Sequence, residues 1–259
     1  MERLRHRPEP FLIEMQELLL IGIGTGNPDH ITLEGVAAMR EADAVLIPRK
    51  GDDKSDLADL RRQICAAHLD DTGHVVEFDL PVRDGDSAYL DAVHAWHDAI
   101  AEVWQAAVPN GAQRVALLIW GDPSLYDSSL RIAARLDPTP KVRVVPGITS
   151  LQVLTAAHGI PLNTLAEPLV ISTGRQLRDH GWPVGADTVA IMLDGSCSFT
   201  QVVSEGVQIW WGAYLGMPQE ILVSGPLAEI SARIVETRAA ARVQNGWIMD
   251  VYLMRRAII

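Results

Sequence analysis

The sequence predicts an α/β protein built from two α/β domains, the first with a mostly parallel sheet and the second with a mixed sheet. Its length of 259 residues suffices for two such units, each with a sizeable buried core. Short apolar runs alternate with amphipathic stretches through the first half, which is typical of a βαβα order. This rhythm changes at residues 159–168, where the text GIPLNTLAEP is rich in turn-forming residues.

The first half predicts five strands, each followed by a helix. Its apolar runs do not alternate strictly with polar residues, as expected for strands that helices cover on both faces. The predicted strands span residues 17–24, 42–48, 74–80, 114–120 and 141–147, and the predicted helices span residues 31–41, 54–68, 86–107, 124–136 and 149–158. This pattern favours a mostly parallel sheet.

Beyond residue 168 the apolar runs are longer and partly alternating, which favours a mixed or antiparallel sheet. The predicted strands span residues 168–173, 187–193, 207–215, 220–225 and 246–254, with helices near 197–205 and 226–243. The chain is therefore divided into an N-terminal extension, a first domain that holds the glycine-rich loop and the GDP segment, and a second domain. Their bounds are residues 1–16, 17–160 and 161–259.

The charge balance argues against one class of partner. The net charge is −11 and the isoelectric point is about 5.1, whereas nucleic-acid binding needs a basic surface that releases counterions. The same charge repels a polyacidic small molecule, so a substrate of that kind needs a local basic patch.

The sequence predicts a cytoplasmic protein without a membrane partner. Its longest apolar run, from Leu18 to Ile23, is far shorter than the ~20 residues of a membrane helix. The first residues carry arginines but no apolar stretch of the length that a signal peptide needs. Cys65 and Cys197 are isolated, which favours reduced, structural thiols over a disulfide framework or a zinc site.

A glycine-rich segment, GIGTGNP at residues 22–28, directly follows the first predicted strand, and Asp29 is a candidate cap for the next helix. The dinucleotide fingerprint G-x-G-x-x-G needs glycine where this chain has Asn27, and the second strand ends in Pro48, Arg49 and Lys50 instead of an acidic residue. A nicotinamide cofactor is therefore disfavoured. A tight turn without a ligand remains an alternative.

Two further turns follow predicted strands. GDPSLYDS at residues 121–128 ends the fourth strand, where Asp122 or Ser124 is a candidate cap, and VPGITS at residues 145–150 ends the fifth, with Thr149 or Ser150 as the cap. A plain capped turn explains either segment taken alone. Because the carboxyl ends of parallel strands meet at one edge of a sheet, we expect the three turns to line one crevice.

In their order and spacing, these segments resemble the tetrapyrrole methylases. GIGTGNP corresponds to the family's glycine-rich first loop, GDPSLYDS to its G-D-P segment, and PGITS followed by AAHGIPL to its P-G segment. The resemblance extends from about Glu17 to Met254. WGDPSLYDSSLRI, ISTGRQL, VAIMLDGSCSF and YLGMPQEILVSGPL look most like the branch that methylates precorrin-5 at carbon 1 in cobalamin synthesis and expels acetate.

The resemblance implies two α/β domains that bind S-adenosylmethionine in the cleft between them, with no metal, and a homodimer. A family methionine aligns to Met192 or Leu193, a family glycine falls near Tyr214 or Leu215, and relatives often have proline in place of Thr25. Gly24 and Gly26 are expected to border the substrate. The implied cosubstrate contacts are Thr25, Trp120, Gly121, Asp122, Leu125, Thr149, Ser150, Met192 or Leu193, and Tyr214 or Leu215.

The implied substrate carries many carboxylates and needs cations in its binding site. Arg49 and Lys50 at the end of the second strand are the predicted carboxylate anchors. Lys54, Arg61 and Arg62 follow on the next stretch, and the sequence favours anchors and ordinary solvated charges equally for these three.

Methyl transfer from a sulfonium depends on alignment and exclusion of water more than on a strong base. Acetate release additionally needs a water molecule and a general base. Asp29, His30 and Asp127 are candidate bases and Arg175 a candidate oxyanion partner by location only, so the catalytic residues are left unassigned.

Two residue pairs have plainer explanations than ligand binding. His94 and His97 stand three apart on a predicted helix, but their acidic neighbours favour a solvated face over a metal site. The tryptophans, including Trp210 and Trp211, fit core or interface packing better than stacking on a macrocycle.

Four alternatives remain open from the residues. They are another precorrin or uroporphyrinogen methyltransferase, a family relative that modifies protein or RNA, a nicotinamide-dependent dehydrogenase, and a tetrapyrrole carrier without transfer activity. The acidic charge disfavours RNA.

Overall fold

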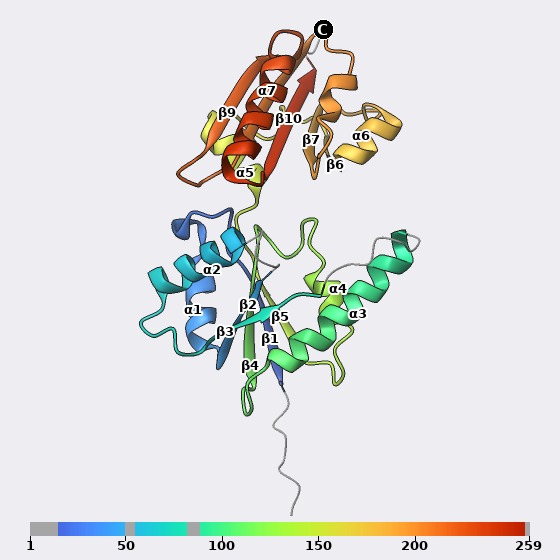
Figure 1. The fold of residues 1–259 in the computed structure, drawn as a ribbon. Helices are drawn as coiled ribbons and strands as arrows, with labels where there is room; N and C mark the ends of the chain where they lie inside the picture. The colour runs from blue at the N-terminus through green and yellow to red at the C-terminus, as the bar shows by residue number, and fades with distance from the viewer. Residues whose placement is uncertain (1–14, 50–54, 82–88, 257–259) are drawn as a thin grey trace, which may run out of the picture. The chain divides into compact units, whose positions relative to one another are not determined.

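The computed structural model describes residues 15–49, 55–81 and 89–256 of the chain. The chain divides into two compact units (Figure 1), each with its own five-stranded sheet. The first unit comprises Met1–Ile21, Leu33–Ile119 and Tyr126–Val145, and the second comprises Gly22–Thr32, Trp120–Leu125 and Pro146–Ile259. The three turns that follow β1, β4 and β5 are thus counted with the second unit.

The sheet of the first unit confirms the parallel prediction. Its strands stand in the order β3-β2-β4-β1-β5, and the β2–β3, β2–β4 and β1–β5 pairs are parallel. The strands are β1 (Glu17–Gly22), β2 (Ala44–Arg49), β3 (Val75–Asp79), β4 (Arg114–Ile119) and β5 (Lys141–Val145). β1, β2 and β4 are buried along most of their length, which explains their unbroken apolar runs.

Helices cover both faces of this sheet, with α1 and α2 on one side and α3 and α4 on the other (Figure 1). Trp104 of α3 and Ile132 of α4 pack in one core cluster with Leu18 and Leu20 of β1. Because side chains alternate along a strand, Leu19 and Ile21 face the other layer. The helices are α1 (Leu33–Glu41), α2 (Ser55–His68), α3 (Tyr89–Ala107) and α4 (Ser129–Ala133).

The sheet of the second unit is mixed, as predicted. Its order is β6-β7-β10-β8-β9, in which β6 and β7 are parallel and the other three pairs are antiparallel. The strands are β6 (Leu169–Thr173), β7 (Thr188–Met192), β8 (Val207–Ala213), β9 (Ile221–Pro226) and β10 (Asp250–Arg256). The end of β8 and the end of β7 therefore lie beside the start of β10.

Two predicted helices belong to this unit: α5 (Ser150–His158), which was predicted as the last helix of the first half, and α7 (Leu227–Asn245). Thr149, one of the two predicted caps, caps α5 with its side-chain oxygen, and Gln152 completes a capping box. Leu151 and Leu154 of α5 pack against Val251 and Leu253 of β10. These contacts tie the turn after β5 to the second sheet.

The prediction was wrong at several element boundaries. Residues 174–180 form a helix, α6 (Gly174–His180), which Thr173 begins by accepting a hydrogen bond from the backbone N–H of Gln176. The helix predicted near 197–205 is only the short 3-10 turn η3 (Ser198–Gln201), and α4 starts later than expected, at Ser129. β10 starts at Asp250 because Gly246, with a positive φ, ends α7.

The turn after β1 contains a second 3-10 turn, η1 (Pro28–His30), which Asn27 caps in place of the predicted Asp29. Among the helices of the described residues, none is long and apolar enough to cross a membrane.

Candidate active site

The three predicted turns lie against one another, as expected. The backbone N–H of Gly121 donates to the carbonyl of Gly24 at 2.7 Å, and the N–H of Gly24 donates back to the carbonyl of Gly121 at 3.4 Å. The backbone N–H of Gly147 donates to Oδ2 of Asp122 at 2.8 Å. One backbone pair and one carboxylate thus join the three turns.

Asp122 connects these turns and does not cap a helix. Its Oδ1 accepts the backbone N–H of Ser124 at 2.8 Å and also the hydroxyl of Ser124. Burial acts to raise the pKa of Asp122, but the hydrogen bonds from Ser124 and Gly147 outweigh it, so the pKa lies below its usual value. The carboxylate is therefore charged at neutral pH and holds the turn after β4 to the turn after β5.

The glycines permit this close approach. A Cβ on Gly147 would lie 2.2 Å from the carbonyl oxygen of Gly121, and a Cβ on Gly22 would lie 2.6 Å from the Cα of Gly147. Gly26 has a φ of +116°, and a Cβ there would lie 2.6 Å from Cε of Met217. Only a residue without a side chain fits at these positions.

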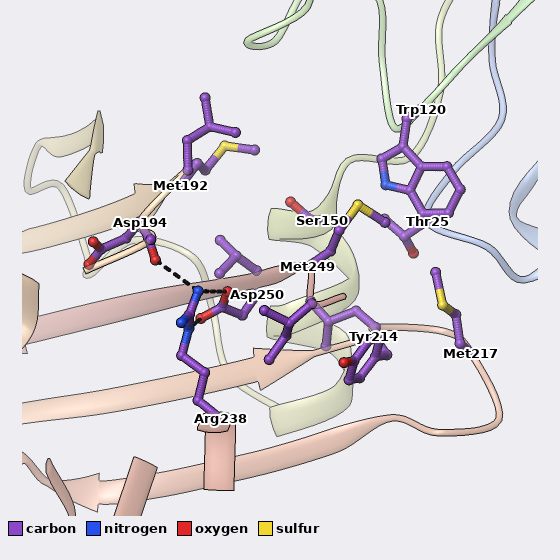
Figure 2. Close-up of a pocket in the computed structure, with 15 residues that line it drawn as sticks. Thr25, Trp120, Ser150, Met192, Asp194, Tyr214, Met217, Arg238, Met249 and Asp250 are labelled. Carbon is purple, nitrogen blue, oxygen red and sulfur yellow. Dashed lines mark hydrogen bonds and ion pairs between the residues drawn. The ribbon is translucent and has the colours of Figure 1, made fainter. Parts of the chain in front are cut away.

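A cavity of about 280 Å³ opens beside the turns, at the edge of the second sheet where β7 and β8 end and β10 begins. Figure 2 shows Thr25, Trp120 and Met217 together at one end and Arg238 between Asp194 and Asp250 at the other. All lining residues belong to the second unit.

Seven of the predicted cosubstrate contacts line this cavity, from turns and strand ends far apart in the sequence. They are Thr25, Trp120, Ser150, Met192, Leu193, Tyr214 and Leu215. Both residues of each ambiguous pair therefore reach the wall. Gly121, Asp122, Leu125 and Thr149 are not among the lining residues. Gly121 and Asp122 instead hold the turns together, and Thr149 caps α5.

Sequence reasoning missed eight lining residues, which are Asp194, Gly195, Met217, Arg238, Ile248, Met249, Asp250 and Val251. Asp194 and Gly195 directly follow β7, so the rule that ligands bind at strand ends was a signal for them. Met217 follows the Tyr214–Leu215 pair in the same turn. Arg238 is one of several arginines along α7, and its sequence neighbours give no signal.

The polar end of the cavity is built around a buried ion pair. Nε of Arg238 donates to Oδ2 of Asp250 at 2.9 Å, and Nη2 donates to Oδ1 at 3.2 Å and to the backbone carbonyl of Asp194 at 3.3 Å. The side chains of Arg238 and Asp250 are only 12% and 8% exposed. Oδ2 of Asp250 also accepts Nε1 of Trp211 at 3.0 Å. This geometry fixes the guanidinium plane.

Two non-glycine residues at the cavity wall have left-handed backbones, Leu193 with φ +54° and Tyr214 with φ +51°. Tyr214 is fully buried, and its hydroxyl donates to the backbone carbonyl of Ala241 at 3.2 Å and also bonds that of Trp247. Its ring packs edge-to-face on Trp247 at 5.3 Å. Tyr214 therefore anchors residues 246–249, which carry the wall residues Ile248 and Met249.

Arg49 is one of the cationic side chains predicted to bind substrate carboxylates. It is paired with two carboxylates of the protein, Asp79 at 2.9 Å and Glu77 at 3.9 Å. Lys50 and Lys54 lie outside the described residues. Burial lowers the pKa of Arg61 to about 10, and this side chain donates to the backbone carbonyls of Leu118 and Leu57.

Arg62 forms ion pairs with Glu77, at 2.6 Å, and with Asp59. Gly24 and Gly26, the predicted substrate neighbours, stand in the turn that also carries Thr25.

Among the candidate bases, His30 lies nearest the cavity wall, with Nδ1 3.4 Å from the hydroxyl of Thr25. Burial lowers the pKa of His30, with Asp29 and Glu220 acting in the opposite direction, so the imidazole is neutral at pH 7. Asp127 belongs to the first unit and accepts the N–H of Ser129, while Asp29 and Arg175 are exposed.

His94, His97 and Trp211 lie among other side chains of the protein. Nδ1 of His94 lies 2.9 Å from Nη2 of Arg135. His97 is buried, so the predicted solvated face is wrong for this residue. Trp211 is fully buried in the second unit, which confirms the packing interpretation for this residue. Cys65 and Cys197 are free thiols.

A family model described as Tetrapyrrole (Corrin/Porphyrin) Methylases matches residues 17–231. The chain belongs to the tetrapyrrole methylase family. This match spans the three turns, the lining residues from Thr25 to Met217 and the strands up to β9, in agreement with the resemblance seen in the motifs. Arg238 and the lining residues at 248–251 lie beyond it.

Two individual relatives give more specific information than the family model. Precorrin-6A synthase (deacetylating) of Sinorhizobium is 45% identical over 251 residues, which cover 93% of this chain and 96% of that protein. Precorrin-2 C(20)-methyltransferase of Sinorhizobium is 28% identical and covers 55% of this chain and 59% of that protein.

Two solved structures are also similar to this chain. The cobalamin synthesis related protein CobF from Corynebacterium diphtheriae is 37% identical, with a TM-score of 0.79 over 93% of this chain and 99% of that one. Uroporphyrin-III C-methyl transferase from Thermus thermophilus, solved with S-adenosyl homocysteine, is 20% identical, with a TM-score of 0.60 over 92% of each chain. At that identity, the second likeness shows a shared fold.

Proposed function

We propose that this tetrapyrrole methylase transfers the methyl group of S-adenosylmethionine to carbon 1 of precorrin-5 and releases acetate, giving precorrin-6A. The observation that carries the proposal is the 45% identity to a precorrin-6A synthase (deacetylating) along nearly the whole length of both chains. Relatives named for other reactions, such as the precorrin-2 methyltransferase, match at 28% over a smaller part of the chain.

The cavity fits part of the methyl donor. Its volume of about 280 Å³ lies at the lower end of the range for small-molecule sites. A cavity of this size suits the adenosyl portion better than the whole methyl donor. The walls from Met192, Leu215, Ile248, Met249 and Val251 are apolar and suit a flat ring. The hydroxyls of Thr25 and Ser150 offer polar contacts at the side of the turns.

The backbone at the strand ends supports the predicted contacts near residues 193 and 214. The glycine of the family resemblance falls near Tyr214 or Leu215, and Tyr214 has the left-handed φ that glycine adopts freely. We therefore align the family glycine with Tyr214. Here the backbone conformation is the shared feature, and the tyrosine side chain adds the anchor to residues 246–249.

The contribution of the turns to catalysis is alignment. Methyl transfer neutralises the positive sulfonium, so the reaction gains from a rigid, dry site more than from a strong base. The contacts among Gly24, Gly121, Gly147 and Asp122 make the turns rigid. The donor supplies the methyl group, and these residues hold its position relative to the acceptor carbon.

Acetate release needs a proton acceptor, and His30 is the proposed one. Its imidazole is neutral at pH 7 because burial lowers its pKa, and it adjoins the wall residue Thr25. A His30→Gln variant should still consume the methyl donor but release acetate more slowly. Mass spectrometry of the ring product, which would then retain the acetyl group, distinguishes this outcome from a general loss of activity.

The direct test is to incubate the purified chain with precorrin-5 and a methyl donor carrying ¹³C in the methyl group. The proposal expects one ¹³C methyl at carbon 1 by NMR and one equivalent of acetate. A methyl at another carbon would identify a different precorrin methyltransferase. Absence of S-adenosylhomocysteine binding in calorimetry, together with binding of a nicotinamide cofactor, would instead support the dehydrogenase alternative.

The division into domains at residues 17–160 and 161–259, the homodimer and the cytoplasmic location stay predictions and form part of this proposal. Arg49 and Lys50 stay the proposed anchors for substrate carboxylates. Light scattering after gel filtration tests the dimer. An Arg49→Gln variant should raise KM for the precorrin and leave donor affinity unchanged.

A further inference from the structure

Arg238 is the one arginine among the residues that line the cavity, and its hydrogen bonds leave part of the guanidinium available. Nε and Nη2 are engaged by Asp250 and by the carbonyl of Asp194. Nη1 has no acceptor among the residues that the structure describes. Because the side chain lines the cavity and is 12% exposed, Nη1 is the donor left for a bound molecule.

The two neighbouring carboxylates are already satisfied. The carboxylate of Asp194 accepts the backbone N–H groups of Ser196 and Ser198, the hydroxyl of Ser198 and the hydroxyl of Tyr252. Asp250 accepts Trp211 in addition to Arg238. The polar end of the cavity therefore presents a hydrogen-bond donor and calls for an acceptor on the ligand.

The local charge selects the kind of acceptor. Asp194 and Asp250 carry two negative charges and Arg238 one positive charge, so a ligand carboxylate placed here would meet a net negative surrounding. A neutral acceptor avoids this repulsion. Within an adenosyl group, the ring nitrogens of the purine are neutral acceptors, and the apolar walls suit the faces of the ring.

We propose that Arg238, held in place by Asp250, donates a hydrogen bond through Nη1 to a purine ring nitrogen of the methyl donor and thereby determines its base specificity. This inference rests on the proposed function. The paired guanidinium is pre-oriented by its contacts with Asp250, so little conformational freedom is lost when the ligand binds. The homocysteine tail lies away from Arg238.

The test compares two probes that share the adenosyl group. S-adenosylhomocysteine carries the amino-acid tail, and 5′-methylthioadenosine lacks it. Calorimetry on the full chain measures the Kd of both probes for the wild type, for Arg238→Lys and for the double variant Arg238→Met with Asp250→Asn. The double variant removes the donor without leaving a buried unpaired charge, and the asparagine keeps an acceptor for Trp211.

The expected result is a weaker affinity of the double variant for both probes by the same factor, about tenfold to a hundredfold. Arg238→Lys should weaken both probes as well, because an ammonium lacks the planar fork. A matched control is Arg242→Met, one turn further along α7 with an exposed side chain, which should bind like the wild type.

Ring-substituted probes identify the acceptor. In the wild type, one of the 1-deaza, 3-deaza and 7-deaza analogues of S-adenosylhomocysteine should bind about tenfold or more weakly than the parent compound. In the double variant, that difference should disappear. Equal binding of all three analogues by the wild type would overturn the proposed contact.

Two other outcomes also decide the matter. If Arg238 variants weaken S-adenosylhomocysteine but leave methylthioadenosine unchanged, Arg238 binds the tail and the inference is wrong. If the variants bind both probes like the wild type, the ion pair is only structural. A wild type that binds neither probe would overturn the proposed function itself, which separates the two failures.

Discussion

The ion pair at the cavity of the second unit differs from the exposed ion pairs of the first unit. In the first unit, Arg49, Arg62, Arg114 and Arg143 pair with carboxylates while their own side chains are 34–44% exposed. In the second unit, Arg238 and Asp250 are 12% and 8% exposed and stand at the cavity. Exposed pairs contribute little to stability because water competes for both partners. A buried pair fixes the geometry of both side chains, and here it orients the hydrogen-bond donor Nη1 of Arg238.

The backbones of the two units also differ, in the contacts of their glycines. The second unit contains glycines whose Cβ positions are occupied by other backbone atoms, and left-handed residues at the ends of β7 and β8. Gly111 of the first unit has a positive φ but no atom within 4 Å of its Cβ position. The close backbone contacts of Gly22 and Gly147 are thus found in the turns beside the cavity.

The largest expected effect separates a buried from an exposed arginine. Arg238→Met should lower the free energy of unfolding by roughly 3–5 kcal/mol, because it leaves Asp250 buried and unpaired. Arg62→Met should lower it by roughly 0–1 kcal/mol, since Arg62 and its partners Asp59 and Glu77 are 30–50% exposed. Urea unfolding followed by circular dichroism measures both. Equal losses of unfolding free energy in the two variants would contradict the proposed difference between the buried and the exposed arginine.

The second prediction concerns close backbone contacts. Gly147→Ala should cost roughly 1–3 kcal/mol and slow methyl transfer about a hundredfold, because the new Cβ pushes the turn after β5 away from Gly121. Gly111→Ala meets open space, so it should keep the wild-type rate despite the backbone strain at φ +89°. A Gly147→Ala enzyme with a normal rate would show that the turns need no such contact.

The third prediction tests the anchor of residues 246–249. Tyr214→Phe keeps the ring contact with Trp247 but removes the hydroxyl that bonds the carbonyls of Ala241 and Trp247, at a cost of roughly 1–3 kcal/mol. Tyr126→Phe, in the first unit, is the control. Its side chain is 46% exposed, so water replaces what the hydroxyl loses and the cost stays below about 0.5 kcal/mol.

The smallest effect is a pH dependence at His30. Burial lowers its folded-state pKa below the usual value of 6.5, so the unfolded chain binds a proton first as the pH falls. The stability contribution is fully present above pH 6.5 and is lost as the pH falls through the folded-state pKa. Melting temperatures at pH 7.5 and 5.5 should therefore differ less in His30→Gln than in the wild type. An unchanged difference would contradict the lowered pKa.

Most of the fold could be predicted because its signals are local. The apolar runs of β1, β2 and β4 are long and uninterrupted, and the glycine and proline turns mark where those strands end. The cap of α5 at Thr149 is likewise readable from neighbouring residues. The helix α6 was missed because GRQLRDH has only Thr173 as a start signal, and the contacts of α6 with β6, β7 and η3 are made by tertiary packing.

The site was predictable as far as it follows strand ends. Seven wall residues were named from the motifs and the family resemblance, and Asp194 and Met217 stand within two residues of named ones. Asp122 and Gly121 were placed in the right turns but serve to join them. Arg238 had no sequence signal, because its burial depends on pairing with Asp250, which belongs to another element, β10.

The sequence by itself determined the two sheets, the three turns and the family, since these depend on hydrophobic periodicity and on residues that permit turns. Only the tertiary structure decided which side chains share a cavity, which arginine is desolvated, and that Tyr214 adopts a left-handed backbone. The physical reason is that burial, ion pairing and strain depend on atoms that are distant in the chain, and a local pattern does not carry them.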